Sequence, residues 1–73
     1  MIEVTEAKHL ENYSLQLEFN NGESIIVDLE QHLIGSIFQL LKDIEYFKQF
    51  TIKFNTIEWE NGADFAPEFL FEL

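Results

Sequence analysis

The sequence predicts an α+β domain in which short helices pack on one face of an antiparallel sheet of four to five strands. Several short segments alternate apolar and polar side chains, which is the pattern of half-buried strands. One central stretch spaces its apolar residues at threes and fours, which indicates helix. Asn-Gly pairs follow two of the strand segments and predict turns. With 73 residues and neither linker nor repeat, the chain is expected to form a single small domain over residues 1–73.

The first three predicted strands occupy the N-terminal part of the chain. Residues 2–5 alternate weakly, whereas residues 13–19 alternate strictly between apolar and polar side chains. Asn-Asn-Gly at 20–22 follows, and Asn-Gly supplies the positive φ angles of a tight type I′ turn. Residues 24–29 then return as a strand, so this part of the chain is expected to form a hairpin.

In the middle of the chain the apolar period becomes helical. The side chains that form the predicted helical face are Leu33, Ile37, Leu40, Leu41, Ile44 and Phe47. Gly35 is expected to interrupt the helix, with Ser36 as the N-cap of a helix over 37–41. Asp43 is expected to cap a second short helix over 44–49 in the same way.

The C-terminal part contains two further strand segments and a final helix. Residues 51–54 and 56–59 combine β-branched and aromatic side chains, and Asn-Thr at 55–56 is expected to form the turn between them. Pro67 suits the first turn of a helix, because its missing N–H costs nothing there. Asp64 is expected to form an Asx turn or to cap the entry of this helix.

The composition excludes several classes of function. The chain has no cysteine, which rules out disulfides and zinc–thiolate sites. Fourteen acidic residues face four lysines and no arginine, and the formal net charge is −10. Nucleic acids are bound by Lys and Arg side chains that displace counterions, so we expect no direct binding of nucleic acid. We also expect a cytoplasmic protein with no membrane partner, since no apolar stretch is long enough to span a bilayer and no signal-peptide pattern is present.

Two segments carry a resemblance to a known family. Residues 59–64 are Trp-Glu-Asn-Gly-Ala-Asp, followed by Ala-Pro-Glu at 66–68. Residues 15–23 are Leu-Gln-Leu-Glu-Phe-Asn-Asn-Gly-Glu. Through these segments the chain resembles the small bacterial domain-of-unknown-function family 2442 over nearly its whole length. The resemblance implies a compact α+β domain of unassigned activity. Some members of the family are fused to a helix-turn-helix domain, and some are encoded beside small toxin-like proteins.

The segment around the tryptophan is the candidate interaction site. The predicted partner-binding residues are Trp59, Glu58, Glu60, Asp64, Phe69 and Phe71. In a strand, the two glutamates that flank Trp59 share one face and are expected to be solvated, with the indole in the core. The alternative is an exposed aromatic anchor rimmed by acids, as in a hot spot for a basic partner. Phe65, Phe69 and Phe71 cannot all face inward on so short a helix, so at least one is expected at a surface or an interface.

Other chemistries have less support in the sequence. The carboxylates of this segment could serve general acid–base catalysis, but one small core leaves little room for a substrate cleft. Asp28, Glu30 and His32 alternate along an extended segment, and this single-histidine pattern is interpreted as structural rather than metal-binding. We therefore expect no catalytic residues, no cofactor and no metal.

The leading hypothesis is a non-enzymatic, acidic protein-interaction module that binds a basic protein, to which the net charge would attract it. The gene neighbourhood implied by the resemblance suggests the antitoxin of a toxin–antitoxin pair. The alternative is a self-associating domain that covers its surplus aromatic residues in a homodimer without a heterologous partner. A small acid-based enzyme or a metal-binding domain is the third hypothesis.

The charge imbalance predicts an effect of salt on stability. We expect the melting temperature to rise at moderate sodium chloride concentrations, because screening weakens the repulsion among the acidic residues. Thermal melts followed by circular dichroism across a salt series measure the effect. A melting temperature that falls as salt is added would show that specific ion pairs matter more than repulsion.

Overall fold

The computed structural model describes all residues, 1–73, and contains two antiparallel sheets. The larger sheet has three strands in chain order, β1 (Val4–His9), β2 (Ser14–Phe19) and β3 (Ser24–Asp28). The smaller sheet pairs β4 (Thr51–Lys53) with β5 (Thr56–Glu58). The predicted α+β class is confirmed, with five strands in all.

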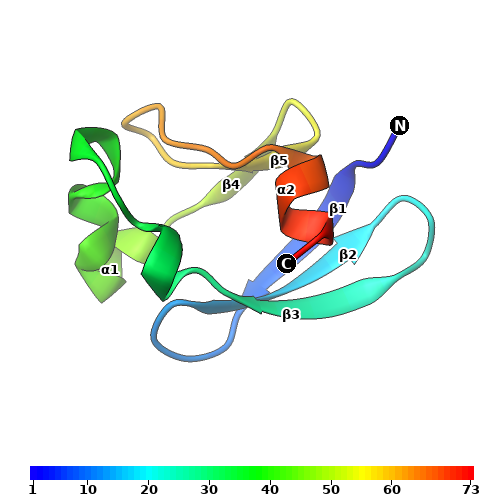
Figure 1. Ribbon diagram of the computed structural model, residues 1–73, viewed down its shortest axis with the longest axis horizontal. Coiled ribbons are helices and arrows are strands. Elements are labelled where there is room, and N and C mark those ends of the chain that lie inside the picture. The colour runs from blue at the N-terminus through cyan, green and yellow to red at the C-terminus, as the bar shows by residue number, and fades with distance from the viewer.

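A single sheet of four to five strands is not formed. The two sheets meet at the start of β1, where the Val4 N–H donates to the Asn55 carbonyl at 2.9 Å. This bond joins β1 to the turn of the β4–β5 hairpin, not to one of its strands. The hairpin therefore lies beside the sheet, next to β1 (Figure 1), and does not extend its ladder.

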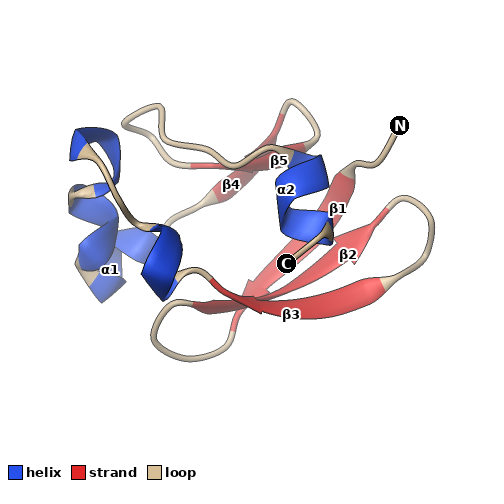
Figure 2. Cartoon of the chain, in the orientation of Figure 1, coloured by secondary structure: helices blue, strands red, loops and turns tan.

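All the helical elements are short. Three 3-10 turns and one α-helix follow β3, and a second α-helix ends the chain: η1 (Glu30–His32), η2 (Ser36–Phe38), η3 (Leu40–Lys42), α1 (Ile44–Phe47) and α2 (Pro67–Phe71). Figure 2 shows the first four gathered at one end of the molecule, with α2 over the three-stranded sheet. No helix has the length and apolar character that a membrane span requires.

The strict alternation of β2 sets one face of the three-stranded sheet toward the core. Leu15, Leu17 and Phe19 are buried, whereas Gln16 and Glu18 are exposed on the opposite face, as predicted. The helix α2 packs on the inner face, where the Phe71 ring meets Phe19 edge-on with centroids 5.0 Å apart. The outer face remains open to solvent, which antiparallel sheets tolerate.

The turn after β2 differs from the prediction. Positive φ occurs at Gly22 (88°) but not at Asn21, so the turn is not type I′. The Gly22 N–H donates to the Phe19 carbonyl at 3.0 Å, and the Phe19 N–H donates to the Glu23 carbonyl at 2.9 Å. These bonds define a three-residue loop, a type I turn followed by a glycine bulge.

One of the two N-caps predicted in the helical region is present. Asp43 caps α1, because its carboxylate accepts a hydrogen bond from the Glu45 N–H at 3.1 Å. Ser36 is not an N-cap: Gly35 precedes the 3-10 turn with a φ of 102°, and no side chain caps that turn. The chain therefore bends at Gly35 and winds as short 3-10 turns in place of the predicted helix over 37–41.

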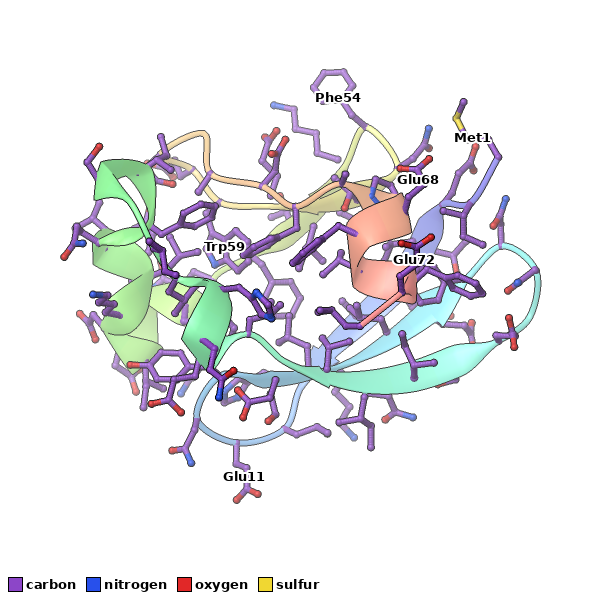
Figure 3. All side chains as sticks on the ribbon, in the orientation of Figure 1. Met1, Glu11, Phe54, Trp59, Glu68 and Glu72 are labelled. Atoms are coloured by element: carbon purple, nitrogen blue, oxygen red, sulfur yellow. The ribbon has the colours of Figure 1, made fainter.

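The turn between β4 and β5 uses Phe54 and Asn55, not the predicted pair at 55–56. Lys53 pairs with Thr56 across the hairpin, so the loop has two residues, and both carry positive φ (54° and 69°). This is the type I′ pattern, which favours Asn and Gly at its first position. An aromatic residue is unfavourable there, because its Cβ is crowded in the left-handed region. The Phe54 side chain is 81% exposed and projects from the tip of the hairpin (Figure 3).

Replacing Phe54 should therefore stabilise the domain. We expect Phe54→Asn to raise the free energy of unfolding by about 0.5–1 kcal/mol, since it relieves left-handed backbone strain and gives up little buried area. Urea unfolding measures the change. Phe54→Leu is the control, because it keeps the strain and should leave the stability nearly unchanged; a loss of stability in the Asn variant would contradict the argument.

Candidate protein-interaction surface

Trp59 lies at the centre of the core, as the preferred interpretation of the sequence predicted. Its indole Nε1–H donates to the Phe47 carbonyl at 2.9 Å, so the buried ring leaves no unpaired donor. The rings of Phe47 and Phe65 lie 5.5 and 6.1 Å from it, centroid to centroid. Figure 3 shows the side chain inside the molecule, between the hairpin and the three-stranded sheet. The alternative interpretation of Trp59 as an exposed anchor is wrong, because the residue is only 1% exposed.

The loop after Trp59 positions the helical region. The loop repeats the geometry of the one after β2, with a positive φ at Gly62 and an Asn61 Oδ1 that accepts from the Ala63 N–H at 3.1 Å. Asn61 also reaches across the chain: its Nδ2 donates to the Ile37 carbonyl at 2.9 Å, and its backbone N–H donates to the Tyr46 hydroxyl at 3.1 Å. The Asn-Gly segment thus has a structural role that holds η2 and α1 against the end of β5.

Two of the three acids of the segment, Glu58 and Glu60, border one depression, and Asp64 lies outside it. Glu60 is exposed, as predicted, whereas Glu58 is partly buried and lies 3.9 Å from the Lys53 ammonium. Asp64 pairs with Glu58 through its backbone in an isolated bridge, which directs its side chain into solvent. The predicted Asx turn or helix cap at Asp64 is wrong, because the carboxylate accepts no hydrogen bond and Ala66 stands uncapped at the start of α2.

The concave surface of the molecule is shallow and open. The depression beside Trp59 measures about 260 Å³ and is lined by Trp59 itself and by five polar residues, Gln49, Thr51, Lys53, Glu58 and Glu60. Asp64 is not part of its lining. A carboxylate pair for acid–base catalysis would need a shared cleft. Glu58 and Glu60 both border this depression, which is open to solvent and not enclosed.

The C-terminal aromatic residues divide between core and surface. Phe65 is buried, Phe71 is partly buried against the sheet, and Phe69 is 39% exposed. The exposed ring stacks on Phe65 at 5.7 Å and meets the His32 imidazole edge-on at 5.1 Å. The prediction that at least one of these rings lies at the surface is therefore confirmed for Phe69.

The residues of the metal hypothesis point in different directions. The chain leaves the extended conformation after Asp28 and enters a 3-10 turn, so alternate residues no longer share a face. The Asp28 carboxylate accepts from the Glu30 N–H at 3.0 Å, and the His32 ring packs on Phe69. No group of three His, Asp or Glu side chains in the structure could hold a metal ion.

An exposed apolar segment that runs from the end of η1 to the first residue of η3 was not predicted from the sequence. Ile37 and Leu40 were predicted on the buried helical face, but both are substantially exposed, and Ile34 is 76% exposed. We call these three residues the aliphatic segment. Its exposure follows from the bend at Gly35, after which Phe38 of η2 and Leu41 of η3 are the side chains that pack against the core. The Ile34-Gly35 junction was the signal for it, since a glycine inside a helical pattern marks a change of direction.

Acidic side chains cover the surface of the molecule, and few of them pair with lysine. All of the carboxylate residues are exposed except Glu3 and Glu58, which are partly exposed. The structure contains two ion pairs, Lys48–Glu45 at 3.3 Å and Lys53–Glu58 at 3.9 Å. Most of the negative charge is therefore free to act on a partner.

The structural role of Asn61 leads to a measurable difference between the two Asn-Gly loops. We expect Asn61→Ala to lower the free energy of unfolding by about 1–2 kcal/mol, because it removes the bond to the Ile37 carbonyl as well as the local one. Asn21→Ala is the matched control: it removes hydrogen bonds confined to its own loop and should cost about half as much or less. Equal losses in urea unfolding would argue against the proposed link to the helical region.

Comparison with curated proteins and with solved structures finds no significant match. The sequence model of one protein family does match, over residues 4–73, and its description is a protein of unknown function (DUF2442). The match covers both Asn-Gly loops, the aromatic core and α2. The chain therefore belongs to the DUF2442 family.

Proposed function

We propose that the chain is a non-enzymatic protein-interaction module that binds a basic protein through an acidic surface with an apolar centre. The observation that carries this proposal is the exposed aliphatic segment, Ile34, Ile37 and Leu40, on a chain of net charge −10. Apolar side chains that a small domain leaves uncovered are the usual centre of a protein contact.

Two residues of the aliphatic segment, Ile37 and Leu40, share one side of the helical path. Residues 36–42 follow a continuous helical path, so Ile37 and Leu40, three positions apart, lie on the same side of it. The exposed acids Glu30 and Asp43 lie at the two ends of this region of the chain. An apolar centre with charged residues around it is the arrangement of a protein interface, where the rim charges steer the encounter.

The charge supports a basic partner over a neutral one. Only two carboxylates are paired with lysines, so complex formation would replace repulsion within the chain by attraction between chains. A small toxin-like protein encoded next to the chain, as the family resemblance implies, would be such a partner. In that case the chain is the antitoxin of the pair.

Co-expression with the product of the adjacent gene tests the proposal. We expect the two proteins to co-purify, and we expect isothermal titration to give a dissociation constant that rises with sodium chloride concentration, because salt screens the attraction between the two surfaces. Replacing Ile37 and Leu40 together by Ser should weaken binding by roughly tenfold or more, since it removes the apolar centre of the contact.

Ile52→Ser is the matched control, because Ile52 is also exposed but lies on β4, outside the aliphatic segment. It should leave the affinity for the adjacent gene product unchanged. The absence of a complex would contradict the proposal, and so would a complex whose affinity ignores both salt and the Ile37 and Leu40 replacements.

A further inference from the structure

The outer edge of β3 is free. β3 has β2 as its only neighbour in the sheet, and Figure 2 shows it at the rim. The bonds from the Phe19 N–H to the Glu23 carbonyl and from the Leu29 N–H to the Tyr13 carbonyl fix the alternation along the strand. Odd-numbered residues of β3 therefore bond to β2, and Ser24, Ile26 and Asp28 direct their backbone N–H and C=O groups outward.

Apart from the charge of Asp28 at its end, this edge lacks the features that normally prevent strand pairing. Free edges of soluble proteins are usually interrupted by lysine, proline, a bulge or a covering loop. β3 is Ser-Ile-Ile-Val-Asp, and its pairing with β2 is regular along its whole length. Ile26 is 67% exposed at the middle of the edge. The strand thus presents unpaired backbone groups and a β-branched side chain together.

We propose that a second copy of the chain pairs antiparallel along β3, with Ile26 opposite Ile26 of the second copy. The two three-stranded sheets would join into one continuous sheet. This inference goes beyond the proposed function, because it concerns a different surface and needs no other protein.

The order of residues in β3 favours a second copy as the occupant. In an antiparallel pair centred on Ile26, Ile25 lies opposite Val27 and Ser24 lies opposite Asp28, so each apolar residue meets an apolar one and no two acids meet. The outward backbone groups of Ser24, Ile26 and Asp28 all find partners in this register. A shift by one pairing step places Ile26 opposite Asp28 or Ser24 and loses this match.

Sedimentation of the purified chain tests the pairing directly. We expect a reversible monomer–dimer equilibrium between about 5 and about 200 μM chain. The dimer should be favoured at about 300 mM sodium chloride, because each copy carries a charge of −10 that salt must screen. A monomer at every concentration and salt level would overturn the proposal and leave the proposed function untouched.

Ile26→Lys should raise the dimer dissociation constant by roughly tenfold or more, because it sets two like charges opposite each other at the centre of the pairing. Ile34→Lys is the control: it makes the same chemical change at a similarly exposed isoleucine, 76% against 67%, away from β3. Equal weakening by both variants would overturn the assignment of the interface to β3. Unchanged melting temperatures in dilute samples, where the chain is monomeric, verify that both variants fold, since neither side chain is buried.

Amide hydrogen exchange identifies the edge and the register. The Ile26 N–H should exchange quickly in dilute samples and slowly at the concentrations where the dimer dominates. The Ile25 and Val27 N–H groups, which bond to β2, should be slow under both conditions. A dimer in which the Ile26 amide stays fast would show that association uses another surface, which would overturn the proposal.

Discussion

The structure depends on the burial of the Trp59 indole more than on any other single interaction. A chain of 73 residues can build only one core, and the largest ring occupies its centre. Burial of an indole is favourable only if its N–H is paired, and the Phe47 carbonyl satisfies it. The same bond joins β5 to the end of α1. The β4–β5 hairpin, the helical region and the three-stranded sheet therefore pack into one core that contains this ring.

Part of the fold could be predicted from the sequence, because a strand that is buried on one face alternates apolar and polar residues. The alternation of β2, the cap at Asp43 and the first position of Pro67 in α2 depend on local chemistry, and the structure contains all three. The turn types could not be predicted, because an Asn-Gly pair suits both a two-residue and a three-residue loop, and the pairing register decides between them. The positive φ of Phe54 opposes local preference and follows from the hairpin as a whole.

The candidate surface was predictable only in outline. The composition of the chain predicted an acidic surface. The alternation of apolar and polar residues in the last strand segment predicted that Trp59 is buried. The aliphatic segment was misassigned because apolar residues three apart suit both a long α-helix and successive 3-10 turns, and the bend at Gly35 changes the direction of the chain. The two contacts that Asn61 makes with the helical region join residues far apart in the sequence. Spacing within one segment carries no information about them.

Every strand pairing in the molecule is a hairpin between neighbours in the chain. Loops this short close quickly, so β1–β2, β2–β3 and β4–β5 can each form early from local contacts. The distant links, such as Val4 to Asn55 and Asn61 to Ile37, complete the structure once these hairpins exist. Folding can therefore begin in any of the three hairpins, and the contacts between β1 and the β4–β5 hairpin, which join distant parts of the chain, are made afterwards.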